Sequence, residues 1–436
     1  MELILDPSGV LLGTTGLLVC GLLMWSCRRF YAWGIGLYAA VRLWELLQQG
    51  GAGGLVGIGI DLMASDLVAL CLLCAGAVRL AGTARGAHPA LGALFAFAAM
   101  WAWSALRGIP DFGLGPAGVE ARGLFQLGAV TLYAATLPPT RAALVTVTRI
   151  WLGCAAVLCA AATLWWVSIG IGGAGQGVLI GGVVSESRPL GAPAALIIAQ
   201  AAVLLLFLKG RSPAVRCAAA ALVLTVVLLQ FRTAWAALVV MLAGLLLTRR
   251  AHTSRLTSFA KAATAAAAVL LVGLLGLGGS LADGLLASSQ DDTTLSWRVA
   301  GWLALLPTVG GPVEWLTGRP FGSGFERLMD GVVVNLSSHN AYLDVLLHLG
   351  LLGVGALLLL FLRMWKDAAR IPEGPLLRLL VAGQLAFGMT CPLYPEQAIL
   401  IGLTLALTRA PLPTAASPVA FPAPQTQEPP CPVAPR

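Results

Sequence analysis

The sequence predicts an all-α polytopic membrane protein with about twelve transmembrane helices, and three observations lead to this fold class. First, 58% of the 436 residues are hydrophobic and only 11% are charged, whereas soluble domains carry about 25% charged residues. Second, the chain contains thirteen apolar runs, most of them near the ~20 residues that cross a bilayer as a helix. Third, the basic residues gather in short clusters between these runs, as topology-determining charges do.

The apolar runs divide the chain into four regions. Residues 1–281 hold about ten spans, at 9–27, 30–48, 64–81, 89–107, 119–137, 148–171, 191–209, 213–231, 233–248 and 261–281. A long connection follows at 282–340, and a C-terminal membrane region, 341–410, holds runs at 341–364, 375–391 and 395–409. The run at 30–48 carries Arg42 and Glu45, and the last two runs are short, so we expect about twelve spans. Residues 411–436 are rich in Pro, Ala and Thr, a composition typical of a disordered tail.

The basic clusters also predict the orientation of the chain. Six of them, between 28 and 370, fall on one side of the membrane in the thirteen-run scheme. The positive-inside rule makes that side cytoplasmic, so the connection 282–340 lies on the opposite side. Most of the basic residues behind the net charge of +8 lie in these topology-determining clusters. The charge therefore does not indicate a nucleic-acid partner.

The connection 282–340 has features of a functional loop. Loops of this length are usually functional or disordered, and its tryptophans and apolar residues argue against disorder. "SWRVAGWLALLPTV" predicts an amphipathic helix lying on the membrane. "GRPFGSGFE" is rich in turn residues, and its glycines resemble a phosphate-binding loop only weakly because no Lys follows them.

The stretch "SSHNAYLDVLLHLGLLGVG", which begins at Ser337, carries polar groups into an apolar run. Ser337 or Ser338 is expected to cap a helix that starts near Asn340. The helix dipole would keep His339 neutral beside an anion-attracting N-terminus, which suits a general base next to a phosphate. The alternative is a polar interfacial residue with no chemistry.

Residues further along this run have structural interpretations. Gly350 and Gly353 share a helical stripe with His339 and would let a neighbouring helix pack closely. Asp344 lies off this stripe, so a direct partnership with His339 is not expected. His348 lies on nearly the opposite face, where a core hydrogen bond or a pairing with a neighbouring helix is expected.

Several arginines lie on the non-cytoplasmic side, against the positive-inside trend. They are Arg188, Arg232, Arg298, Arg319 and Arg327. A guanidinium presents two donors to two oxygens and therefore binds phosphate efficiently. For any single arginine, snorkelling to the interface is the alternative.

Four of these segments resemble one known family, the bacterial O-antigen ligase and polymerase superfamily of integral membrane glycosyltransferases. They are "SRPLGAP", "FRTAWAALVVML", "SWRVAGWLALLPTV…GRPFGSGFE" and "SHNAYLDVLLHLGLLG". Together they cover about residues 185–365, and the N-terminal half matches the family only in hydropathy. The chain departs from the family pattern where "QFRTAW" replaces a Ser-Arg-Gly turn and where Phe-Glu follows the Gly-x-Gly.

The resemblance implies a membrane C-type glycosyltransferase fold in the bacterial inner membrane, with its active site facing the periplasm. The ligases transfer O-antigen glycan from undecaprenyl diphosphate to a hydroxyl of the lipid A–core oligosaccharide, without nucleotide sugar, metal or other cofactor. His339 would be the general base, and inversion at C1 is expected. Arg188, Arg232 and Arg298 would bind the diphosphate. Asn340, Tyr342, Arg319 and Glu396 are the candidate supporting residues, with Glu396 expected to orient His339.

Other functions remain open at this point. A polymerase would use a second lipid-linked repeat unit as the acceptor, and a related branch glycosylates proteins. The absence of a long C-terminal periplasmic segment favours the ligase over the protein-modifying branch. A transporter or flippase of lipid-linked saccharides would carry charged groups at the bilayer midplane in two repeated halves. The candidate residues instead gather at one face.

Overall fold

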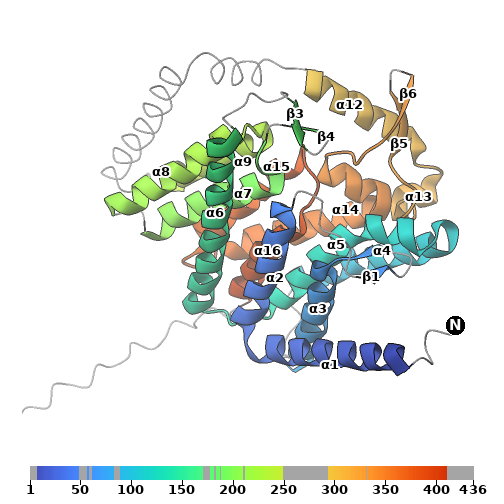
Figure 1. Ribbon diagram of the computed structural model, residues 1–436, viewed down its shortest axis with the longest axis horizontal. Coiled ribbons are helices and arrows are strands. Elements are labelled where there is room, and N and C mark those ends of the chain that lie inside the picture. The colour runs from blue at the N-terminus through green and yellow to red at the C-terminus, as the bar shows by residue number, and fades with distance from the viewer. Residues whose placement is uncertain are drawn as a thin grey trace, which may run out of the picture.

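The computed structural model describes residues 7–48, 56–57, 61–82, 89–169, 177–180, 183–186, 188–209, 212–248, 293–329 and 331–409. Helices make up most of this part of the chain, and nine of them match the first nine apolar runs (Figure 1). They are α1 (Pro7–Arg29), α2 (Tyr31–Leu47), α3 (Ala64–Gly82), α4 (Pro89–Phe112), α5 (Leu114–Ala135), α6 (Arg141–Ile169), α7 (Ala192–Lys209), α8 (Pro213–Leu228) and α9 (Arg232–Thr248). The tenth run, 261–281, and the tail, 411–436, lie outside the described residues.

Four helices are long and apolar enough to cross a membrane, at Ala64–Gly82, Pro89–Phe112, Arg141–Ser168 and Ala341–Ala368. The mostly helical structure and these four helices are compatible with an all-α membrane protein, but twelve spans are not seen in the described ranges. The apolar helices α15 (Gly374–Gly388) and α16 (Ala398–Thr408) are shorter than a span needs. Every residue of α16 is buried, and a helix that is buried on all sides is apolar all round. Hydropathy alone does not separate such a core helix from a membrane span.

The connection that precedes α14 (Ala341–Ala368) folds into a small module of its own. The helix predicted there is present as α12 (Thr293–Leu305), and the turn η2 (Leu306–Thr308) and helix α13 (Pro312–Thr317) follow it. The sequence did not predict the antiparallel hairpin of β5 (Glu326–Met329) and β6 (Val332–Asn335) that comes next. Figure 1 shows α12, the hairpin and α13 together at one end of the molecule, beside α14 and α4. Two further hairpins are β1 (Val56–Gly57) with β2 (Asp61–Leu62), and β3 (Gly177–Ile180) with β4 (Val183–Glu186).

Helix α14 (Ala341–Ala368) is kinked at Gly350, whose φ is 65°. The chain after α13 packs into this kink, and the Arg319 backbone N–H donates to the Leu347 carbonyl at 2.6 Å. A Cβ at Gly350 would overlap the Leu316 carbonyl and the Gly318 nitrogen. The predicted close packing at Gly350 therefore occurs, and the partner is the end of α13 rather than a second long helix.

Candidate functional site

His339 lies between two residues that the fold holds in place. On one side, the Ser338 hydroxyl donates to Asp344 Oδ1 at 2.6 Å, and the Ser338 carbonyl accepts from the indole N–H of Trp302 in α12 at 2.7 Å. On the other side, the Asn340 backbone N–H donates to the Ser338 hydroxyl at 3.0 Å. Asp344 therefore acts on the turn that carries His339 and not on His339 itself.

The helix cap differs from the predicted one. Asn340 is the N-cap of α14, and its Oδ1 accepts from the backbone N–H groups of Tyr342 and Leu343, both at 3.0 Å. The prediction that Ser337 or Ser338 caps the helix was wrong. Asn accepts from N2 and N3 as well as Ser does, so the choice between neighbouring polar residues depends on the turn and not on residue type.

The backbone at His339 is in the left-handed region, with a φ of 52°. Among the described residues, Gln230 is the one other non-glycine residue with positive φ, at 56°. Gln230 lies two residues before Arg232, in the turn that leads into α9. Such conformations cost free energy and gather at functional sites. Here one is the candidate base His339 itself and the other lies two residues before Arg232.

The segment 389–391 joins the start of α14 to the rest of the site. The Asn340 side-chain amide donates to the Met389 carbonyl at 3.0 Å. The Ala341 backbone N–H donates to the Cys391 carbonyl, also at 3.0 Å. His339 is thus held against the chain that connects α15 to α16.

Thr390, in the middle of this segment, contacts two further candidate elements. The Arg298 guanidinium of α12 donates from Nη1 to the Thr390 carbonyl at 3.3 Å. The Thr390 hydroxyl lies 2.6 Å from the hydroxyl of Thr233, the residue after Arg232 in the first turn of α9. The segment 389–391 therefore brings together α9, α12 and the His339 turn.

Arg188 lies next to the turn that leads into α9. Its guanidinium carbon is 4.7 Å from the ring centroid of Phe231, which directly precedes Arg232. The four predicted site residues, Arg188, Arg232, Arg298 and His339, are thus carried by segments that are linked by contacts, although the first and the last lie 151 residues apart in the sequence.

The electrostatic surroundings of His339 favour its neutral form. Partial burial is the largest cause that lowers the pKa of the His339 imidazole, and the positive charges of Arg298 and Arg327 lower it further. Arg327 is buried in β5 and donates to the Leu336 carbonyl at 2.7 Å, just before the His339 turn. A neutral imidazole beside guanidinium groups has the charge state of a general base near an anion site.

The pH dependence of the transferase activity expected from the sequence tests whether Arg298 lowers the pKa of His339. Activity that needs neutral His339 is present above the pKa of the folded protein and is lost as the pH falls through it. Arg298→Gln removes a positive charge, so the pKa rises toward its usual value and the acid limb of the pH–rate profile is expected to move to higher pH. Arg298→Lys keeps the charge and should leave the limb in place. An unchanged limb in Arg298→Gln would show that Arg298 does not act on His339.

The candidate supporting residues lie in different places. The Tyr342 hydroxyl donates to the Leu385 carbonyl of α15 at 2.9 Å and so ties the first turn of α14, next to His339, to α15. Arg319 lies elsewhere, where its guanidinium donates to the Thr308 hydroxyl at 2.6 Å and to the Ser323 carbonyl at 2.9 Å. Arg319 therefore organises the glycine-rich turn.

Glu396 has another partner, so the expectation that it orients His339 is corrected. Arg42 of α2 donates from Nε to Glu396 Oε1 at 2.9 Å and forms ion pairs with both Glu396 and Glu45. Glu45 Oε1 in turn accepts from the Ser65 backbone N–H at the start of α3 at 3.1 Å. Buried ion pairs of this kind compensate charges that would otherwise be costly. Sequence reasoning treated Arg42 and Glu45 only as flaws in a span, and no local signal points to their distant partner.

The glycine-rich turn binds a carboxylate from within the chain. The Gly322 backbone N–H donates to Glu120 Oε2 at 2.6 Å, and the Gly324 N–H donates to Oε1 at 2.8 Å. Both glycines have positive φ, at 94° and 71°, which turns successive N–H groups toward one anion. The weak resemblance to a phosphate-binding loop thus has a physical basis, and the anion that the turn binds is the Glu120 carboxylate of α5.

His348 lies directly beneath this turn. Its ring stacks on Phe321 and meets Phe325 edge-on, with centroids 5.0 Å apart in each case. Nδ1 lies 3.8 Å from Glu120 Oε2 on the neighbouring helix α5, and the core hydrogen bond expected for His348 is not seen among the described residues. That distance is too long for a hydrogen bond, and both ring nitrogens are buried without a hydrogen-bond partner in the described ranges.

Glu120→Gln is expected to loosen the glycine-rich turn. The glutamine amide has one oxygen that can accept from a backbone N–H, and its NH₂ group cannot accept. One charge-assisted hydrogen bond is therefore lost, at a cost of about 1.5–3 kcal/mol. Amide exchange at Gly322 and Gly324 should accelerate by about tenfold or more. Glu326→Gln, an exposed carboxylate on the adjacent strand β5, is the matched control and should leave exchange unchanged. Equal exchange rates in Glu120→Gln and the wild type would show that the Glu120 carboxylate does not hold the glycine-rich turn.

Compared with known proteins, the chain matches no family model and no curated protein. The family resemblance therefore depends on its motifs alone, and three of these, carrying Arg232, Arg298 and His339, contact the segment 389–391 through these residues or their chain neighbours.

Proposed function

We propose that the chain is a membrane glycosyltransferase that moves a glycan from undecaprenyl diphosphate to a hydroxyl of the lipid A–core oligosaccharide. The observation that carries the proposal is the meeting of the segments bearing Arg188, Arg232, Arg298 and His339 around 389–391. Segments that lie far apart in the sequence are linked here by contacts of these residues or their chain neighbours, through Thr390, the carbonyls of Met389 and Cys391, and the Phe231 ring. On this proposal the active site faces the periplasm, and the fold is of the membrane C-type class.

The chemistry follows from the residue types. The sugar C1 is already activated by its diphosphate leaving group, so the protein must accept one proton and stabilise departing negative charge. His339 accepts the proton of the acceptor hydroxyl, the hydroxyl oxygen bonds to C1, and the bond from C1 to the diphosphate oxygen breaks. The arginines stabilise the diphosphate, the kind of electrostatic term that often dominates catalysis. Direct displacement inverts the configuration at C1.

The test is transfer by the purified full chain in detergent. The reaction contains undecaprenyl-diphosphate-linked glycan, lipid A–core acceptor and EDTA, with no nucleotide. Glycan on the lipid A–core with the wild type, and not with a His339 variant, supports a metal-independent ligase. Glycan that lengthens on its own carrier replaces this proposal with a polymerase.

A second candidate function is transport of lipid-linked saccharides. It is favoured by one observation, the charged cluster of buried Glu396 with partly buried Arg42 and Glu45, since ionisable residues inside a membrane often mark substrate pathways. These charges are paired with one another and connect α2 to the segment after α15, which is also a structural role. Flux of a lipid-linked glycan across proteoliposomes, without any transfer, would favour the transporter.

A further inference from the structure

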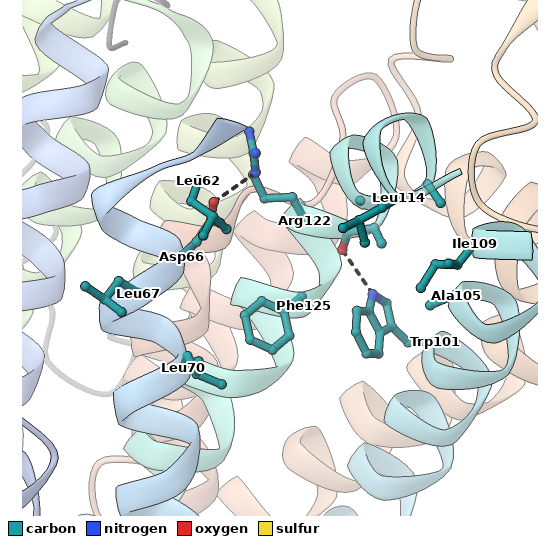
Figure 2. Close-up of a pocket in the computed structure, with 13 residues that line it drawn as sticks. Leu62, Asp66, Leu67, Leu70, Trp101, Ala105, Ile109, Leu114, Arg122 and Phe125 are labelled. Carbon is teal, nitrogen blue, oxygen red and sulfur yellow. Dashed lines mark hydrogen bonds and ion pairs between the residues drawn. The ribbon is translucent and has the colours of Figure 1, made fainter. Parts of the chain in front are cut away.

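A groove of about 290 Å³ lies among α3, α4 and α5 and takes no part in the proposed reaction. Figure 2 shows side chains of α3 on one side and of α4 on the other, with those of α5 between them. Leu67, Leu70, Ala105, Ile109 and Phe125 give the lining its apolar character. Asp66 and Arg122 lie together at one end of the view.

The polar groups of the groove are engaged within the protein. Asp66 accepts from the Gln126 amide at 2.6 Å and pairs with Arg122 Nε at 3.1 Å. The Trp101 indole N–H donates to the Ala121 carbonyl at 3.0 Å. A ligand of this groove therefore finds hydrocarbon to contact and no waiting polar partner. Apolar cavities do not hold ordered water, so water is a poor occupant.

The rim of the groove is open to the surroundings of the helices. Leu70, Ile109 and Leu114 on the three helices remain 48%, 42% and 43% exposed. Two of the walls, α3 and α4, are among the helices long and apolar enough to cross a membrane, so we expect lipid hydrocarbon as the medium at this rim.

The length of the groove matches a single hydrocarbon chain of one bilayer leaflet. Along α5 the lining runs from Leu114 to Phe125, about 16 Å of helix. This is about half of the ~30 Å hydrocarbon core, the depth that chains of one leaflet occupy.

We propose that this groove binds a single acyl chain of a bilayer phospholipid, with the Asp66–Arg122 pair at its polar end. The inference rests on the groove and the membrane-length walls alone, and it stands whether or not the chain transfers glycans.

The test is photolabelling of the full-length protein in phospholipid vesicles. A phosphatidylcholine with a diazirine in its acyl chain is added in trace amount, and adducts are mapped by mass spectrometry after illumination. Adducts are expected on the groove-lining residues of α3, α4 and α5. Ala105→Phe fills the groove and should reduce these adducts by about tenfold. Leu106→Phe, at the adjacent and 68% exposed position, is the control and should leave them unchanged.

Three results would overturn the proposal. The first is labelling of the groove no stronger than labelling of the exposed face around Leu106. The second is full labelling in Ala105→Phe; Gly118→Leu, which fills the groove from α5, replaces that variant if it does not fold. The third is displacement of the phospholipid label by an equal amount of a polyprenyl phosphate, which would assign the groove to an isoprenoid chain instead.

Discussion

Glycan transfer is expected to fall by about 10²- to 10⁴-fold when His339 is replaced by asparagine, the range that a general base contributes. Asparagine tolerates the left-handed backbone that His339 adopts, so the turn between Ser338 and Asn340 should persist. It offers no group that accepts a proton at neutral pH. The initial rate of glycan appearance on the lipid A–core measures the loss.

His339→Gly separates catalysis from stability at the same position. Glycine adopts a φ of 52° without strain, so the free energy of unfolding should rise by about 1 kcal/mol. Transfer should nevertheless be as slow as in His339→Asn. A residue kept for function at a cost in stability behaves in this way.

The opposite pattern would reject the role of His339. If His339→Asn keeps more than about a tenth of the wild-type rate, far above what loss of a general base leaves, His339 is a polar residue of the interface. If His339→Gly lowers the stability, the left-handed turn is held by the imidazole, and the loss of transfer in either variant reports folding.

The sequence locates the helices well because apolar runs mark segments that leave water, whatever surrounds them. It does not tell which of these helices cross a bilayer. Helix α16 has only 11 residues, all buried, and its neighbours are other helices and not lipid. Its composition is that of a span, since protein core and hydrocarbon select the same side chains.

The candidate site divides in a similar way. Groups with distinctive chemistry, His339 and Arg298, are visible in the sequence because a base and a phosphate-binding cation need those side chains. The segment 389–391 is not visible, because all three of its residues contribute backbone carbonyls, which every residue has. Pairings such as Glu120 with Gly322 join residues about 200 positions apart, and no local pattern encodes such a partnership.

Arg42→Met is expected to destabilise the protein by about 3–5 kcal/mol, the cost of leaving a buried charge without its partner. Arg42 pairs with two carboxylates, Glu45 and Glu396, and both are left uncompensated in the variant. Chemical denaturation in detergent measures the change.

Transfer should fall as well, because Glu396 lies five residues after Cys391 on the chain that holds His339 and Arg298. When Glu396 loses its partner on α2, the segment 389–391 loses one of its two anchored ends. Arg42→Met is therefore expected to lower both stability and transfer rate, although the ion pairs of Arg42 are with Glu45 and Glu396 and not with a candidate catalytic group.

The triple variant Arg42→Met, Glu45→Gln, Glu396→Gln isolates the electrostatic part of this effect. It removes both orphaned charges and is expected to recover most of the lost stability, since neutral replacements of buried ion pairs are often tolerated. Arg370→Met is the matched control, because Arg370 forms an ion pair with Asp367 but its side chain is 65% exposed. Its effect should stay below about 1 kcal/mol. Equal effects of Arg42→Met and Arg370→Met would mean that the pair on α2 does not anchor the segment, and His339 would then depend on α14 and α12 alone.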